Sequence, residues 1–227
     1  MLEFKDVTKT FNKLTTAITD LSFKVDDGEF VFISGPSGAG KTTILRLILR
    51  DTMPDTGQIL IDGKDVTKLK GREIPLLRQS IGTVFQDFKI IKERSVRENV
   101  EVALEIINTP FKEWRDRVNH VLELVGLSGK GEFFPIQLSG GELQRASLAR
   151  ALVVNPKIIL ADEPTGNLDW ETSNHLMELF EKINKEGKTI IMATHNEMII
   201  DKMKKRVLKI NDGRLAGKEE AGKKSKK

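Results

Sequence analysis

Short apolar segments alternate with amphipathic segments along most of the chain. Residues 2–7 and 18–25 partly alternate between apolar and polar side chains, as half-buried strands do. Residues 29–34 contain a run of four apolar side chains, which is typical of a strand buried on both faces. Residues 41–50 follow with apolar side chains at helical spacing. Strands that alternate with helices in this way predict an α/β fold.

The alternation continues towards the C-terminus, with one long helical interruption. Later strands are expected at residues 58–62, 81–85, 157–161, 189–194 and 206–210, and later helices at 171–185 and 197–204. Residues 95–125 follow a helical pattern that Asn108, Thr109 and Pro110 break into two pieces. We therefore expect a single domain over residues 1–217, with a parallel-sheet core and a helical insert at about 88–153.

Composition narrows the class of protein. The chain has 227 residues, of which 39% are hydrophobic and 31% charged, a balance that suits a soluble domain with a sizeable core. No apolar run exceeds four residues, whereas a membrane span needs roughly 20, and the first residues lack the order of a secretory signal. The absence of cysteine excludes disulfides and thiolate metal sites, and three scattered histidines predict no zinc cluster. We expect a cytoplasmic protein.

Most of the formal net charge of +4 lies in residues 218–227. These hold five lysines and two glutamates, a charge of +3, which leaves the rest of the chain at +1. A body so close to neutrality lacks the broad basic face that a phosphate backbone requires, so we expect no nucleic-acid partner. Because these ten residues contain no apolar side chain larger than alanine, we expect a disordered tail, with weak attraction to anionic lipid as the alternative.

A phosphate-loop motif connects the buried strand at 29–34 to the helix that follows it. The pattern G-x-x-x-x-G-K-[ST] occurs here in the strand–loop–helix context that it requires. Glycines let successive backbone N–H groups face an anion, and the helix N-terminus adds partial positive charge. We expect Lys41 to reach the β- and γ-phosphates and the Thr42 hydroxyl to bind Mg²⁺. The expected nucleotide-binding residues are Gly35, Pro36, Ser37, Gly38, Ala39, Gly40, Lys41, Thr42 and Thr43.

A second buried strand, at 157–161, ends in two carboxylates. Asp162 lies at the strand's C-terminal end, where it could hold Mg²⁺ through water. Glu163 follows it and could take a proton from the water that attacks the γ-phosphate. An Asp-Glu pair after a strand is otherwise a common solvated strand end, but a phosphate loop in the same chain favours the catalytic interpretation.

The run Ser139, Gly140, Gly141 and Glu142 begins another helix. Serine is a good N-cap, and the two glycines allow a phosphate to approach the backbone N–H groups. An ordinary capped helix would not need both glycines. We therefore interpret this run as a second anion-binding helix start, which a chain could donate to the nucleotide of another copy.

Taken together with the phosphate loop, the runs at 138–145 and 162–169 closely resemble the ATPase subunits of ABC transporters. The resemblance implies a phosphate-loop ABC ATPase fold with an added antiparallel β subdomain. It also implies a stacking contact of Phe11 with adenine, a γ-phosphate contact from His195, and a role for Asp169 in coupling two nucleotide sites. Gln86 is implied to join Mg²⁺, the attacking water and a membrane partner. The family further implies a homodimer that sandwiches two ATP molecules.

Residues 72–78, 81–87 and 134–142 are most similar to the group of the family that acts in cell division. That group implies an integral membrane partner, a position on the inner face of the plasma membrane, and activation of peptidoglycan hydrolysis instead of transport. The run at 160–169 is shared with lipoprotein-release and macrolide-export ATPases, which remain the alternative. Asn196 stands where the family usually has Asp, and we expect little effect from this difference.

Other phosphate-loop classes fit less well. The chain has no N-K-x-D motif to read guanine, and a kinase would lack the run that begins at Ser139. Soluble ABC proteins of translation or DNA repair need two cassettes or a long coiled coil, for which 227 residues leave no room. A scaffold that recruits division proteins remains possible as a different class, but Glu163 and His195 favour hydrolysis.

Overall fold

The computed structural model describes residues 1–11 and 15–216, and the chain divides into two compact units. Unit 1 comprises Met1–Arg78 and the chain from Thr189 onwards, and unit 2 comprises Gln79–Lys188. Within the described residues, no helix has the length and apolar character that crossing a membrane demands. The predicted tail at 218–227 lies outside the described residues.

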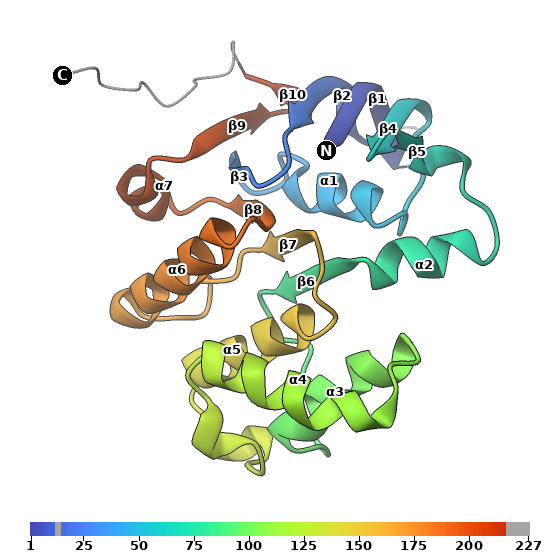
Figure 1. Cartoon of the computed structure of the whole chain (residues 1–227). Coiled ribbons are helices and arrows are strands. Elements are labelled where there is room, and N and C mark those ends of the chain that lie inside the picture. Colours follow the sequence, from blue (N-terminus) through green and yellow to red (C-terminus); the bar gives the residue numbers. More distant parts are fainter. Residues whose placement is uncertain (12–14, 217–227) are drawn as a thin grey trace. The chain divides into compact units, whose positions relative to one another are not determined.

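Unit 1 contains a four-stranded antiparallel sheet (Figure 1). Its strands are β1 (Leu2–Phe11), β2 (Thr15–Val25), β4 (Thr56–Ile61) and β5 (Lys64–Asp65), in the order β2-β1-β4-β5. Phe4 and Phe23, partners in the β1–β2 register, stack with ring centroids 4.5 Å apart. This sheet confirms the antiparallel β subdomain that the family resemblance implied.

A second group of strands in unit 1 is mostly parallel. β3 (Phe30–Ser34) pairs in parallel with both β8 (Thr189–Thr194) and β9 (Arg206–Asn211), and β10 (Arg214–Leu215) pairs antiparallel with β9. β8 is buried throughout and β3 nearly so, as the unbroken apolar runs predict. Helix α1 (Lys41–Ile48) follows β3 after the phosphate loop, and helix α7 (Glu197–Met203) follows β8.

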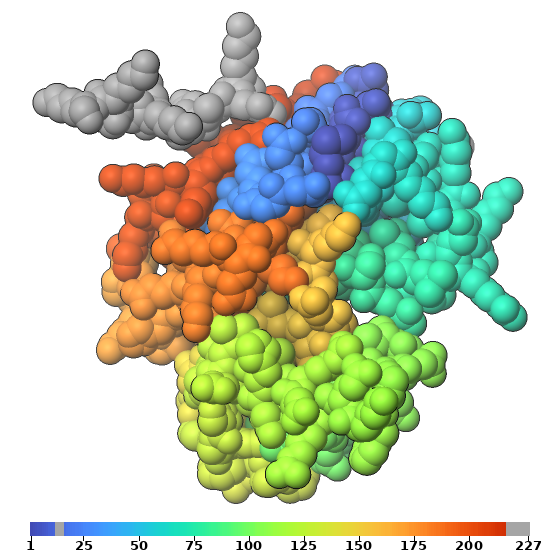
Figure 2. Space-filling model, in the orientation of Figure 1, coloured from blue at the N-terminus to red at the C-terminus, as the bar shows by residue number. Residues whose placement is uncertain are grey.

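Unit 2 joins two parallel strands to a helical layer. β6 (Ile81–Phe85) pairs with β7 (Ile158–Asp162), and α6 (Trp170–Lys185) follows β7. Helices α3 (Val96–Ile106), α4 (Phe111–Leu124) and α5 (Gly140–Leu152) pack on one another, with short 3₁₀ turns at Ser128–Lys130 and Pro135–Gln137. In Figure 2 the helices between β6 and β7, coloured green to yellow, form one continuous surface of this unit.

The predicted α/β class and parallel strands are confirmed, and the structure corrects some boundaries. The first helix ends at Ile48, not at residue 50, because Arg50 has a left-handed backbone with φ 53°. β1 extends to Phe11 because its last residues pair with β2. Helix α2 (Glu73–Gln79) was not expected from the sequence, because it is only seven residues long and contains Pro75, a residue that usually ends a helical pattern. The limits of the single domain and of its insert stay predictions.

Candidate functional site

The phosphate loop is shaped by glycines that other residues could not replace. Gly40 has φ 104°, and a Cβ built there would lie 2.5 Å from the carbonyl oxygen of Ala17. Gly38 has φ 80°, but a Cβ there would meet nothing within 4 Å. The loop is therefore packed tightly against β2 on one side and has open space beside Gly38, as a backbone that receives a phosphate needs.

Lys41 is already directed at the loop. It is the first residue of α1, its side chain is only 8% exposed, and its ammonium donates hydrogen bonds to the carbonyl oxygens of Gly35 at 2.8 Å and Pro36 at 3.2 Å. Because the ammonium is held over the loop, a phosphate bound there would meet a nearby cation. Thr42 and Thr43 follow in the first turn of the helix, with Thr42 exposed.

Strand pairing places His195 beside the phosphate loop. Ser34, the last residue of β3, is the parallel partner of Thr194, the last residue of β8. The loop that starts at Gly35 and the exposed His195 therefore leave the same edge of the sheet from adjacent strands, roughly 5 Å apart. Asn196, which stands where the family usually has Asp, accepts a hydrogen bond from the Ile199 N–H at 3.2 Å. It therefore serves as the N-cap of α7.

Phe11 lies at the end of β1, opposite Thr15 of β2 in the register of the antiparallel sheet. The Lys9 ammonium is 5.4 Å from its ring centroid, and the ring is half-buried. One side chain of this pair is aromatic and the other cationic, a combination that suits a nucleotide base and its phosphates. The stacking of Phe11 on adenine stays a prediction.

In unit 2, two predicted catalytic residues, Gln86 and Glu163, also follow the ends of adjacent parallel strands. Phe85, the last residue of β6, pairs in parallel with Asp162, the last residue of β7. Gln86 and Glu163 therefore follow directly from neighbouring strand ends. Glu163 is half-buried and has a left-handed backbone with φ 46°, an uncommon conformation for glutamate.

Asn167 joins these two loops, and sequence reasoning assigned it no role. Its side-chain amide donates to the carbonyl oxygen of Gln86 at 3.0 Å, and the Gln86 amide donates to the Asn167 Oδ1 at 3.5 Å. A Cβ at Gly166 would lie 2.8 Å from Gln86 Nε2, so the chain passes close to the Gln86 side chain here. The signal available in sequence was the position of Asn167 within the run that follows Glu163.

The helix start at Ser139 is a complete capping box, as predicted for an N-cap serine. Ser139 Oγ accepts the Glu142 N–H, and Glu142 accepts the Ser139 N–H at 2.9 Å. Lys130 forms an ion pair with the same carboxylate. The Lys130 ammonium and the Ser139 N–H lower the pKa of Glu142 to about 2, so Glu142 stays charged at neutral pH. Glu142 thus fixes the helix start instead of facing a ligand freely.

This ion pair predicts a shift in acid unfolding. A carboxylate whose pKa is depressed in the folded state adds stability that is complete above its unfolded value near 4.5 and is lost as pH falls towards 2. Lys130→Met removes the larger cause, so its unfolding midpoint in an acid titration followed by circular dichroism is expected at higher pH than that of the wild type. Lys112→Met, at an exposed lysine of α4, is the control and should leave the midpoint in place.

Asp169 is the N-cap of α6. Its carboxylate accepts the Thr172 N–H at 2.9 Å and the Thr172 hydroxyl at 2.7 Å, and these bonds lower the pKa of Asp169. The residue is exposed at the surface, so its side chain can meet another copy of the chain. Its predicted role in coupling two nucleotide sites stays a prediction.

The predicted Mg²⁺ ligands suit the ion chemically. Thr42, Gln86 and Asp162 offer a hydroxyl, an amide oxygen and a carboxylate, which are the hard oxygen ligands that Mg²⁺ prefers, with phosphate oxygens and water completing its shell. Among the described residues, no group of three or more His, Cys, Asp or Glu could hold a metal ion. This donor set suits a metal ion that is bound by the protein and a nucleotide together better than one that is bound by protein ligands alone.

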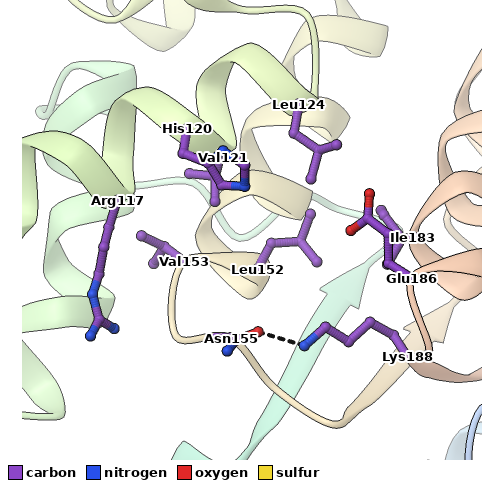
Figure 3. Close-up of a pocket in the computed structure, with 10 residues that line it drawn as sticks. All are labelled: Arg117, His120, Val121, Leu124, Leu152, Val153, Asn155, Ile183, Glu186 and Lys188. Atoms are coloured by element: carbon purple, nitrogen blue, oxygen red, sulfur yellow. Dashed lines mark hydrogen bonds between the residues drawn. The ribbon is translucent and has the colours of Figure 1, made fainter.

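A surface pocket of about 330 Å³ lies elsewhere in unit 2 (Figure 3). It opens between α4, the end of α5 and the end of α6, with Val121, Leu152 and Ile183 among its apolar walls. Lys188 donates a hydrogen bond to the Asn155 side chain at its edge. None of the predicted site residues lines this pocket, so it carries no part of the nucleotide chemistry.

Comparison with known proteins gives a consistent result. The ABC transporter family profile matches residues 18–166. The chain is 48% identical over 222 residues to the cell division ATP-binding protein FtsE of Bacillus subtilis, covering 98% of this chain and 97% of the relative. It is 44% identical over 217 residues to FtsE of Escherichia coli, covering 96% and 98% respectively. These names favour the cell-division group over the lipoprotein-release and macrolide-export alternative.

A solved structure agrees with this result. The fold matches the dimeric structure of an ATP-binding cassette in a post-hydrolysis state bound to ADP and Pi, with a TM-score of 0.88 and 36% identity over 98% of this chain and 99% of the other. Both the sequence relatives and the fold thus extend over nearly the whole chain. The chain belongs to the ABC transporter family, in its group of cell division ATP-binding proteins FtsE.

Proposed function

We propose that this chain is the ATP-hydrolysing subunit of an FtsE–FtsX type complex, and that ATP-driven closure of its homodimer activates peptidoglycan hydrolysis during cell division. The observation that carries this proposal is the pairing of strand ends. Register places His195 beside the phosphate loop and Gln86 beside Glu163. In the first pair, the phosphate loop and His195 both contact the γ-phosphate. In the second pair, Gln86 orients the attacking water and Glu163 accepts its proton.

Binding begins with the phosphates. The loop from Gly35 to Gly40 offers its backbone N–H groups, and Lys41 exchanges its carbonyl partners for β- and γ-phosphate oxygens. Phe11 stacks on the adenine through the face of its ring. Thr42, Asp162 and Gln86 would hold Mg²⁺, and the ion would supply positive charge to offset the charge that develops on the phosphates during transfer.

Hydrolysis requires a water in line with the γ-phosphate. Gln86 orients this water, and Glu163 accepts its proton as it attacks. His195 donates a hydrogen bond to the γ-phosphate and holds it in position. Asn167 keeps the Gln86 loop and the loop after Glu163 together, so that both groups act on one water.

The second copy of the chain contributes the helix start at Ser139. Backbone N–H groups at Gly140 and Gly141 and the partial charge of α5 complement the γ-phosphate held by the other copy. Asp169 couples the two sites across the dimer. We further propose that residues 1–217 form a single ATPase domain with a helical insert at about 88–153.

The surface after Gln86 is proposed to receive the cytoplasmic part of the membrane protein. Phe88 and Ile90 are half-buried, and Ile91 is 36% exposed. Val96, the next apolar residue along the chain, is only 1% exposed because it packs in the core at the start of α3. The docking surface is therefore Phe88, Ile90 and Ile91, surrounded by charged residues at 87–94, and the assembled complex lies on the inner face of the plasma membrane.

The docking surface is tested by a charge substitution. Ile91→Glu should abolish co-purification with the FtsX-type membrane protein while the ATPase rate of the free chain stays unchanged, because a carboxylate desolvates poorly in an apolar groove. Ile106→Glu is the matched control, since Ile106 is 58% exposed at the end of α3, away from this surface. Wild-type recovery of the membrane protein with Ile91→Glu would place the docking site elsewhere.

A further inference from the structure

The loop that follows Gln86 adopts a costly backbone conformation. Phe88 and Lys89 are consecutive residues with positive φ, 60° and 50°, in the left-handed region that side chains with a Cβ disfavour. Two such residues in succession persist only where surrounding contacts over-determine the conformation. The loop must therefore be held by groups outside it.

Arg150 of α5 supplies the principal hold. Its guanidinium donates to the carbonyl oxygen of Lys89 at 2.7 Å and to that of Phe88 at 3.1 Å. These two acceptors belong to the two left-handed residues, and the planar fork of arginine matches two adjacent oxygens. Burial lowers the pKa of Arg150, yet an arginine starts so high that the group stays charged.

The arrangement around Arg150 indicates a specific task. Among the described residues, no carboxylate pairs with it, so this half-buried cation is directed at the loop alone. Burying a charge against two neutral carbonyl groups costs free energy. The arrangement is therefore explained if the loop conformation that it fixes serves a function. A lysine could neutralise charge as well, but it could not bind both oxygens with one rigid plane.

Gln86 is bracketed by contacts from this same helix. Before it, Gln144 of α5 donates to the carbonyl oxygen of Phe85 at 3.3 Å, and after it Arg150 holds Phe88 and Lys89. Beyond the loop, the buried Asn99 of α3 fixes Ile91 by accepting its N–H at 2.8 Å. Within the loop, the Phe88 and Lys89 N–H groups donate to the carbonyl oxygens of Phe85 and Asp87. The segment is thus anchored on both sides of Gln86, and Arg150 adds a hold on the left-handed pair from outside the loop.

We propose that Arg150 is a positioning residue for Gln86: its fork on the Phe88 and Lys89 carbonyls fixes the loop so that the Gln86 side chain meets the attacking water. This inference rests on the role proposed above for Gln86. Arg150 lies near the C-terminal end of α5, the helix whose N-cap is Ser139.

The kinetic test compares kcat with KM in the full chain with Mg²⁺ and ATP. Arg150→Met should lower kcat by about 10- to 100-fold, as small misplacements of a catalytic group do, with KM for ATP within about twofold of the wild type. Arg150→Lys keeps the charge but lacks the fork, so its kcat should lie between those of the wild type and Arg150→Met. If Arg150→Met does not fold, Arg150→Lys is compared with the wild type instead. Unchanged kcat in both variants would overturn the proposal.

A matched control separates positioning from general stabilisation. Arg78 also donates to two consecutive carbonyls, those of Leu49 at 3.0 Å and Arg50 at 2.9 Å, but it lies in unit 1. Arg78→Met should leave kcat at the wild-type value. In a Gln86→Ala background, Arg150→Met should cause no further loss of kcat, because it acts only through Gln86. Losses that multiply would instead show a separate, structural effect and overturn the proposal.

Hydrogen exchange distinguishes a failure of this proposal from a failure of the proposed function. In the nucleotide-free chain, Arg150→Met should speed exchange of the amides at 88–91 and leave those of α3 unchanged. Unaltered exchange at 88–91 would remove Arg150 as the hold on the loop. If Gln86→Ala keeps full kcat, the role assigned to Gln86 is wrong, while the exchange result still decides whether Arg150 fixes the loop.

Discussion

Glu163→Gln is expected to bind ATP and leave it unhydrolysed. The amide keeps the shape of the side chain but cannot accept a proton from water, and general-base assistance is typically worth about 10²–10⁴-fold in rate. The variant should therefore accumulate as an ATP-bound dimer in size-exclusion chromatography. Steady-state phosphate release measures the loss of activity, and a binding titration shows that the affinity for ATP is retained.

The control for this result is Glu178→Gln, the same chemical change at an exposed glutamate of α6. It should hydrolyse ATP at the wild-type rate. Activity near that of the wild type in Glu163→Gln would remove Glu163 from the role of general base. The left-handed backbone of Glu163 would then be a consequence of the turn after β7 alone.

Lys41→Ala is expected to weaken nucleotide binding itself. A hydrogen bond from a charged group contributes about 1.5–3 kcal/mol, so losing the ammonium should raise the Kd for ATP by about 10- to 100-fold. Calorimetry at constant ionic strength measures this change. The effect should be larger for ATP than for AMP, because Lys41 is assigned to the β- and γ-phosphates.

Lys68→Ala is the matched control for this change, at a lysine whose side chain is 74% exposed in the same unit. It should leave the Kd for ATP unchanged. Unaltered ATP affinity in Lys41→Ala would contradict the assignment. The Lys41 ammonium would then stabilise the loop by its hydrogen bonds to the carbonyl oxygens of Gly35 and Pro36, without contributing to nucleotide binding.

The α/β class and the motifs could be predicted from the order of residues alone. Runs of apolar residues at 29–34, 157–161 and 189–194 marked strands buried on both faces, because only such strands tolerate apolar side chains at every position. The break at Asn108–Pro110 separated two helices correctly, since proline cannot continue a helix. The capping box at Ser139 was also predictable, because its bonds are local in sequence.

Short elements could not be found in this way. Helix α2 is only seven residues long and contains Pro75, and the two-residue strands β5 and β10 are too short to show a period. Each of these two short strands forms a tight hairpin with the strand just before it, β5 with β4 and β10 with β9.

Which side chains lie close together could not be predicted from the sequence, because it depends on how the strands pair. Register between parallel strands placed His195 beside the phosphate loop and Gln86 beside Glu163, although more than 70 residues separate the members of each pair in the chain. The bonds of Arg150 to Phe88 and Lys89, and of Asn167 to Gln86, likewise join distant segments. Local chemistry can be read from a motif, but a contact across the sheet exists only once register is set.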